Sequence, residues 1–249
     1  MVTIKTAGAA VMGLVKNRLL RMMFIPVVPS GVEAGIGPFL VHVSDTPIDI
    51  YPFIRRVIQK INPSILVHTG DLVDNIKLSS NQHLLPVYQK HIAKFMDIIN
   101  AFPYMKCYIL PGNHDHLQTL IDAAGAERII SPGPRLFHGR YFYLSHDYPD
   151  ADEITKPDVP SSGGKKGGNS NLSPTESLVP ITLYGHRFTP KTRDAENALF
   201  TGKAENTPHL LNGLEKINII DLGTGAVFHI PYPMDTNRYR KIDKQISGM

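Results

Sequence analysis

An alternation of short apolar runs with longer amphipathic runs, in the first half of the chain, constrains the fold more than any other feature. The short runs at residues 39–44, 64–68 and 105–110 are typical of buried strands. Between them, residues 48–61 and 83–102 carry apolar side chains at helical spacing. Strand, helix, strand, helix, strand in this order predicts parallel strands joined by right-handed crossovers, and therefore an α/β fold.

The sequence changes character after Ile129, where short strand candidates follow one another without long helical runs between them. His138 and Gly139 are typical of a tight hairpin turn. This half of the chain therefore predicts a more antiparallel, β-rich layer. The candidates are residues 135–138, 141–146, 181–184, 216–222 and 226–230.

Two segments stand apart from this pattern. Residues 150–179 are rich in Gly, Ser, Asn and Pro, so they cannot bury enough apolar surface to offset their ordering entropy. They predict a flexible insertion, either a tolerated surface loop or a flap over a site. Residues 1–38 are interpreted as an N-terminal extension that packs on the domain, with a membrane-surface helix or a targeting segment as alternatives. One domain, residues 39–249, would contain the insertion.

Charge and composition exclude several classes of function. The net charge is +4, and residues 1–40 account for +3 of it. The nearly neutral remainder lacks the clustered basic charge of strong nucleic-acid binders. A single cysteine, Cys107, excludes a disulfide framework and favours the cytoplasm, whereas eleven histidines suffice for metal sites without sulfur. No apolar run approaches the roughly 20 residues that a transmembrane helix needs.

Polar clusters follow several of the predicted strands, at the point where each strand ends. Ligands of open α/β sheets gather beyond the carboxyl ends of the strands, so we expect these distant residues to converge. Carboxylates, an amide oxygen and imidazoles suit Mn, Fe or Zn, and a shared carboxylate can bridge two ions that together promote phosphoryl displacement. The converging residues are Asp45, Asp71, Asn113, His114, His146 and His186.

The order of these clusters resembles the calcineurin-like metallophosphoesterase family over about residues 39–230. The resemblance implies a four-layered α/β sandwich with two facing mixed β-sheets and a metal centre at the strand ends. The family motifs are Asp-x-His, Gly-Asp, Gly-Asn-His-Asp/Glu, a lone His and Gly-His-x-His. They match this sequence at Asp45, at Gly70-Asp71, at Gly112-Asn113-His114-Asp115, at His146 and at Gly185-His186.

The sequence departs from the family at two positions, because Pro47 and Phe188 stand where the motifs have histidine. By the resemblance, both missing residues would bind the first metal ion, which keeps only Asp45 and the bridging Asp71. Two carboxylates would hold a hard ion such as Mg²⁺ or Mn²⁺ weakly. His116, Asp49 and Asp147 lie near the motifs as substitute ligands. The second site would be complete, with Asp71, Asn113, His146 and His186.

The resemblance implies a metal-dependent phosphoesterase that hydrolyses a phosphomonoester or phosphodiester by metal-activated water. Its cofactors would be divalent ions, Mn first and Fe, Zn or Mg as alternatives, with one ion bound firmly. His114 would donate a proton to the leaving oxygen, and Asp115 would orient its ring. Asn113, His114 and Arg187 would contact the substrate, a phosphoester small molecule or a nucleotide.

Two other functions remain open. The losses at Pro47 and Phe188 favour a catalytically weak phosphoesterase-fold protein that binds a nucleotide or a protein partner. A nuclease of the same broad family is disfavoured by the nearly neutral body. Among the other polar residues, His42 and His68 are interpreted as hydrogen-bonded core residues, and Asp74 as the cap of the turn after Asp71.

Overall fold

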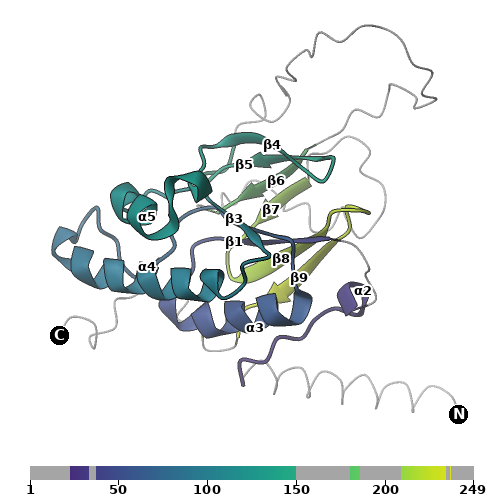
Figure 1. The fold of residues 1–249 in the computed structure, drawn as a ribbon, viewed down its shortest axis with the longest axis horizontal. Helices are drawn as coiled ribbons and strands as arrows, with labels where there is room; N and C mark the ends of the chain where they lie inside the picture. The colour runs from purple at the N-terminus through teal and green to yellow at the C-terminus, as the bar shows by residue number, and fades with distance from the viewer. Residues whose placement is uncertain (1–22, 34–37, 150–179, 186–208, 234–235, 237–249) are drawn as a thin grey trace, which may run out of the picture.

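The computed structural model describes residues 23–33, 38–149, 180–185, 209–233 and 236 (Figure 1). The helices are α2 (Ser30–Glu33), α3 (Tyr51–Ile61), α4 (Leu85–Asn100) and α5 (Leu117–Ala124), with short 3-10 turns at Ile48–Ile50, Gln82–Leu84 and Ala126–Arg128. The strands are β1 (Phe39–Val43), β2 (Ile65–His68), β3 (Lys106–Ile109), β4 (Gly133–Phe137), β5 (Arg140–Leu144), β6 (Ile181–Tyr184), β7 (His209–Asn212), β8 (Lys216–Asp221) and β9 (Val227–Pro231).

The first sheet has five strands in the order β3-β2-β1-β8-β9. Strands β1, β2 and β3 are parallel, and they follow one another through α3 and α4, as the alternation in the sequence predicts. Strands β8 and β9 come from the end of the chain and add to the edge of β1 in antiparallel register. All five residues of β1 are buried, which explains why its sequence is an unbroken apolar run apart from His42.

The second sheet has four strands in the order β4-β5-β6-β7. Strands β4 and β5 form the predicted hairpin, and both turn residues, His138 and Gly139, have positive φ angles of 48° and 79°. The expectation of a more antiparallel layer is wrong for the rest of this sheet, because β5, β6 and β7 pair in parallel. The antiparallel strands β8 and β9 belong instead to the first sheet.

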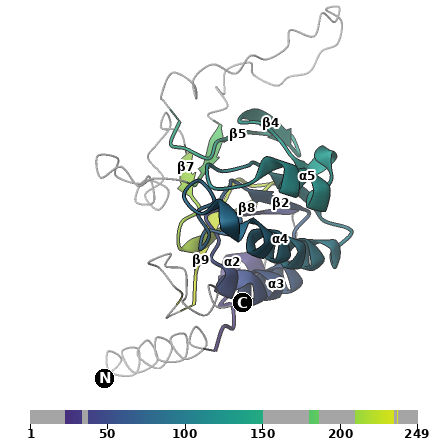
Figure 2. The same ribbon diagram turned by 90° about the vertical axis from the view of Figure 1, so that its left-hand side faces the viewer.

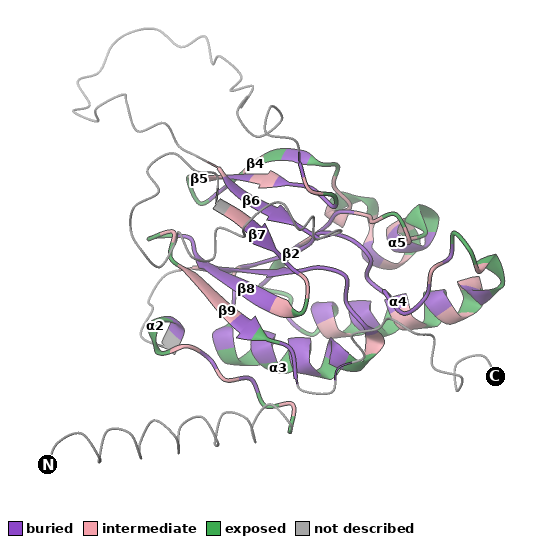
Figure 3. Ribbon diagram, turned by 180° about the vertical axis from the view of Figure 1, so that it is seen from behind, coloured by how far each residue is buried: buried purple, intermediate pink, exposed green. Residues whose placement is uncertain are grey.

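The elements stack as layers (Figure 2). Helices α3 and α4 pack their apolar sides against one face of the first sheet, and the second sheet packs against the other face. Figure 3 shows that the strands of the two sheets are mostly buried, whereas the outer sides of the helices are exposed. The predicted α/β fold with two facing mixed sheets is therefore confirmed, and the described residues form three of the four expected layers.

Local signals explain where the helix before β2 begins and ends. Pro52 lies in the first turn of α3, where its missing N–H removes no helical hydrogen bond. Asn62 ends the helix in the left-handed conformation, with φ 53°, and its N–H bonds the carbonyl of Ile58. The predicted strand and helix boundaries in this half of the chain agree with the structure to within about two residues.

Of the N-terminal extension expected over residues 1–38, residues 1–22 and 34–37 lie outside the described residues, and Val28 and Val32 are buried in the core. The insertion at 150–179 also lies outside the described residues. Cys107 is buried in β3, as expected, and burial raises the pKa of its thiol to about 12. In the part of the chain that the structure describes, no helix is both long and apolar enough to cross a membrane.

Candidate metal centre

Asp45 and Asp71 follow the parallel strands β1 and β2, and backbone hydrogen bonds join the two loops that carry them. The N–H of Asp45 donates to the carbonyl of Gly70 at 2.9 Å, and that of Thr46 donates to the carbonyl of Asp71 at 3.0 Å. Both aspartates have left-handed backbones, with φ angles of 47° and 56°. This conformation is tolerated by Asp and concentrates at functional sites. The two strand ends therefore hold two carboxylates side by side.

A third carboxylate, that of Asp74, joins this pair. Oxygen atoms of Asp45, Asp71 and Asp74 lie within 4.8 Å of one another, and the three residues are 3%, 1% and 0% exposed. The N–H of Asp74 donates to the carbonyl of Thr46 at 3.2 Å, which fixes its loop against that of Asp45. Sequence reasoning missed this member of the cluster; the only available signal was a second aspartate three residues after Asp71.

His146 and Asn113 lie close to each other and to Asp71. His146 Nδ1 donates to the carbonyl of Thr69 at 2.7 Å, so in the neutral ring Nε2 carries a lone pair. That Nε2 lies 3.0 Å from Asn113 Oδ1 and 3.7 Å from Asp71 Oδ2. Three acceptor atoms therefore face one another. Asp71 Oδ2 is buried, and none of the described residues donates a hydrogen bond to it.

These donors fit a divalent cation. A ring nitrogen, an amide oxygen and a carboxylate oxygen are a ligand set typical of first-row divalent metals. A histidine whose other ring nitrogen is held by a carbonyl is the usual arrangement of a metal-binding imidazole. The cluster of Asp45, Asp71 and Asp74 places further negative charge beside this point, which a cation would offset.

The electrostatics around Asp71 also favour a bound cation. Burial raises the pKa of Asp71 to about 8, and the nearby carboxylates of Asp115, Asp45 and Asp74 add to the rise, while a hydrogen bond from the N–H of His114 opposes it. A divalent ion bound beside Asp71 would lower this pKa again, because the ion favours the charged carboxylate.

Two glycines let the loops approach closely enough to form the centre. A Cβ added at Gly112 would stand 2.5 Å from the backbone nitrogen of Asp71 and 2.8 Å from Cε1 of His146. A Cβ at Gly70 would stand 2.7 Å from the Cα of Gly112, and Gly70 also has a positive φ of 108°. No larger residue fits at either position without moving the neighbouring ligands.

Asp115 organises the loops around Asp71. Its carboxylate accepts hydrogen bonds from the backbone N–H groups of Asp71 at 2.8 Å, Leu72 at 3.0 Å and Gly112 at 2.9 Å, and from the hydroxyl of Tyr88 at 2.9 Å. Burial raises the pKa of Asp115, and these hydrogen bonds oppose the rise. Through these contacts Asp115 holds together the loops that carry Asp71 and Gly112.

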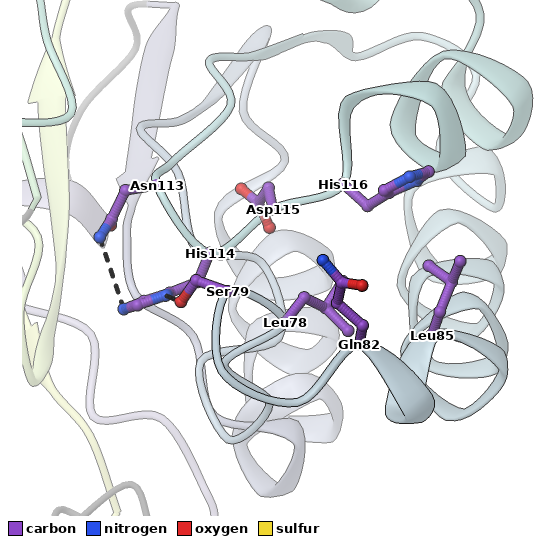
Figure 4. Close-up of a pocket in the computed structure, with 8 residues that line it drawn as sticks. All are labelled: Leu78, Ser79, Gln82, Leu85, Asn113, His114, Asp115 and His116. Carbon is purple, nitrogen blue, oxygen red and sulfur yellow. Dashed lines mark hydrogen bonds between the residues drawn. The ribbon is translucent and has the colours of Figure 1, made fainter.

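His114 lies at the edge of the centre and faces a cavity of about 500 Å³ (Figure 4). Its backbone N–H donates to Asp71 Oδ1 at 3.0 Å. Its ring Nδ1 lies 3.3 Å from Ser79 Oγ, and its Nε2 lies 3.5 Å from Asn113 Nδ2. Leu78 and Leu85 also line this cavity. The ring therefore stands between the candidate metal ligands and a space large enough for a small organic group.

The structure brings together most of the residues expected at the site, namely Asp45, Asp71, Asn113, His114 and His146. The expected ligand His186, the expected substrate contact Arg187 and Phe188 lie outside the described residues. Gly185, directly before them, follows the last residue of β6, and a Cβ there would collide with the side chains of Ser44 and Asp45. The end of β6 thus abuts the carboxylate cluster.

The structure also describes the three residues that the sequence offered as substitute ligands of the first metal site. His116 caps α5, because its ring Nδ1 accepts the N–H of Thr119 at 3.3 Å, and Asp49 and Asp147 are exposed. The expectation for the two strand histidines is confirmed. His42 bonds Thr69 Oγ1 at 2.9 Å, and His68 bonds Thr46 Oγ1 at 3.0 Å; both are fully buried.

Two facing mixed sheets with a cluster of carboxylate, amide and imidazole groups at their strand ends define the class of the metallophosphoesterases. The family model for calcineurin-like phosphoesterases matches residues 40–238, and the chain belongs to that family. A buried acidic cluster suited to the divalent metals that this family typically uses is present at Asp45, Asp71 and Asp74.

The solved structures that the chain matches have low sequence identity to it. An archaeal phosphodiesterase is 14% identical, with a TM-score of 0.42, and the match covers 78% of this chain and 99% of that one. Yfce, a phosphoesterase from E. coli, is 13% identical, with a TM-score of 0.40 and the same coverage of 78% and 99%. No curated protein sequence matches the chain.

Proposed function

We propose that this chain hydrolyses a phosphomonoester or a phosphodiester with the help of bound divalent metal. The observation that supports this most directly is the convergence of His146 Nε2, Asn113 Oδ1 and Asp71 Oδ2 beside His114. The proposed ligands are Asp45, Asp71, Asn113, His146 and His186. The proposed ion is Mn²⁺, because the set mixes oxygen with imidazole nitrogen. The lone Cys107 favours the cytoplasm as the location.

A divalent ion, when bound, supplies Lewis-acid activation of water and neutralises charge on the phosphoryl oxygens. The chain's own residues supply the rest. The two carboxylate oxygens of Asp71 have different neighbours: Oδ1 accepts the N–H of His114, and Oδ2 faces His146. The position of the His114 loop is thereby tied to the ligand that the two metal sites share. A substrate phosphoryl group held at the centre would lie next to the His114 ring.

We propose His114 as the proton donor to the leaving oxygen. Its ring is partly exposed at the cavity, and Ser79 Oγ lies 3.3 Å from Nδ1 and restrains the ring. Asn113 and Arg187 are proposed to contact the substrate together with it. The neighbouring cavity, of about 500 Å³, has the size expected for the organic part of a phosphoester small molecule or a nucleotide.

The test is hydrolysis of bis-p-nitrophenyl phosphate and p-nitrophenyl phosphate by the full chain saturated with Mn²⁺. His114→Ala should lower turnover by about 10²- to 10⁴-fold, because it removes the proton donor, while bound metal stays unchanged. His83→Ala is the matched control, since His83 is an exposed histidine outside the centre. Wild-type turnover no higher than that of His114→Ala would contradict the proposal and favour a phosphoesterase-fold protein that binds a nucleotide or protein partner.

A further inference from the structure

The first metal site lacks the two histidines of the family motifs. One of the two replacements, Pro47, is part of the buried structure. Pro47 is buried and directly precedes the 3-10 turn Ile48–Ile50. The side chain of proline carries no ligand atom, so it cannot replace the missing imidazole. If the first site binds an ion, another side chain has to complete it.

Asp74 occupies the place from which such a ligand can come. It is 0% exposed, and one of its carboxylate oxygens lies within 4.8 Å of oxygens of both Asp45 and Asp71. Oxygen ligands about 2.1 Å from one small divalent ion stand roughly 3 to 4 Å apart, so small side-chain rotations suffice to bring all three onto one ion. Among the described residues, this is the group of acidic and histidine side chains that meets the geometry of a cation site.

The loop that carries Asp74 is held rigidly against the loop after β1. Thr46 Oγ1 and the hydroxyl of Tyr51 both donate to the carbonyl of Leu72, each at 2.7 Å. The N–H of Ile48 donates to the side-chain oxygen of Asn75 at 2.7 Å. These bonds flank Asp74 on both sides in sequence, so its carboxylate is positioned before any ion arrives.

A separate observation indicates that a cation belongs here. Asp71 Oδ2 is buried and receives no hydrogen bond from the described residues, while the acceptor atoms of His146 and Asn113 face the same point. A buried carboxylate oxygen surrounded by other acceptors is costly unless a positive charge lies among them. Asp71 belongs to the carboxylate cluster with Asp45 and Asp74 and also faces His146, so it can bridge two ions.

On these grounds we infer that Asp74 is a ligand of the first metal site, where it replaces the family's histidines with a third carboxylate. The inference rests on the proposed metal centre. It gives the two sites different chemistry: the first offers only carboxylate oxygens, from Asp45, Asp71 and Asp74, whereas the second includes the imidazole of His146. Oxygen-only sites favour Mg²⁺ and Mn²⁺, and imidazole-containing sites also favour Zn²⁺.

The test is a titration of the metal-free full chain with Mn²⁺, followed by calorimetry and by electron paramagnetic resonance. The wild type should bind two Mn²⁺ ions of unequal affinity, and Zn²⁺ should displace only the tighter one. Asp74→Asn, which preserves the shape of the side chain, should weaken the looser ion by about 10- to 100-fold and leave the tighter ion nearly unchanged. Asp97→Asn, which changes an exposed aspartate on α4, is the matched control.

A second variant guards against misfolding of the first. Asp74→His would restore an imidazole to the site, so the looser site should gain affinity for Zn²⁺ relative to Mn²⁺. Two unaltered Mn²⁺ sites in Asp74→Asn, or a single Mn²⁺ ion in the wild type, would overturn the inference. Metal binding is read without turnover, so two ion classes in an inactive protein would refute the proposed hydrolysis and not the role of Asp74. Turnover by a protein that binds a single ion would refute the role of Asp74 and not the proposed hydrolysis.

Discussion

The imidazole of His146 donates its Nδ1 proton to the carbonyl of Thr69 at 2.7 Å, and this one bond determines which ring nitrogen faces the metal centre. The carbonyl can only accept, so Nδ1 must carry the proton. In the neutral ring, Nε2 is then left as an electron-pair donor, 3.0 Å from Asn113 Oδ1. The ring is thus prepared for a cation by a backbone group at the end of the neighbouring β2.

His146→Ala should therefore weaken Mn²⁺ binding at the tighter site. The variant removes the proposed nitrogen ligand and leaves Asn113 and Asp71 facing each other as acceptors alone. We expect the dissociation constant to rise by at least about 10- to 100-fold in isothermal titration calorimetry. His138→Ala, in the β4–β5 turn, should bind Mn²⁺ like the wild type. Equal affinity in His146→Ala would remove His146 from the ligand set.

Gly70→Ala should disrupt the centre sterically. Gly70 has a φ of 108°, and an added Cβ would collide with His146 and with the backbone of Gly112. Gly139→Ala is the matched comparison, because Gly139 also has a positive φ, of 79°, but has nothing within 4 Å of an added Cβ. Backbone strain alone costs about 1 to 2 kcal/mol. In urea unfolding, Gly70→Ala should lose clearly more stability than Gly139→Ala, and it alone should lose Mn²⁺ affinity. Equal losses in the two variants would mean that the contact is unimportant.

Asp115→Asn should affect the protein at two levels. The carboxylate accepts three backbone N–H groups and the Tyr88 hydroxyl, and an amide would turn a donor toward at least one of these donors. We expect a loss of roughly 2–4 kcal/mol in the free energy of unfolding. Tyr88→Phe removes only one of the four bonds and should cost about 1 kcal/mol. Denaturant titration measures this loss of stability, and the metal content measures whether the loops that Asp115 holds still form the metal centre. A mild Asp115→Asn phenotype equal to that of Tyr88→Phe would contradict the positioning role.

Stability should depend on pH through His42. Burial, together with nearby Lys216, lowers the pKa of His42 from 6.5 to about 3, so the folded protein keeps this ring neutral. The unfolded chain protonates it below about pH 6.5, so the stability that the neutral ring confers is present above that pH and declines as the pH falls toward 3. Between pH 7 and pH 5, His42 should account for a loss of about 2 kcal/mol.

The measurement is a double difference, because Asp71 and His68 also titrate in the metal-free protein. Unfolding free energies of the wild type and of His42→Gln are compared at both pH values in the presence of a chelator. The gap between the two proteins should shrink by about 2 kcal/mol at the lower pH. A gap that stays constant with pH would show that His42 is not the titrating group.

Local patterns in the sequence were enough to predict the first half of the fold. The apolar runs that become β1, β2 and β3 are fully local signals, and so is the amphipathic spacing of α3 and α4. Strand β7 (His209–Asn212) was not predicted, because a run this short carries little periodicity. The parallel pairing of β5, β6 and β7 was not predicted either, because pairing depends on contacts between segments far apart in the chain.

In the candidate site, too, local features could be predicted from the sequence and contacts between distant segments could not. The sequence by itself determined that Asp45, Asp71, Asn113 and His146 follow strand ends, because motif spacing and strand positions are local properties. Only the tertiary structure decided that Asp74 joins the carboxylate cluster and that Asp115 turns toward Tyr88 and the Asp71 loop. The direction of a side chain after a strand depends on hydrogen bonds between neighbouring loops and on the space left by buried neighbours. Both arise only when β1, β2 and the loop after β3 come together.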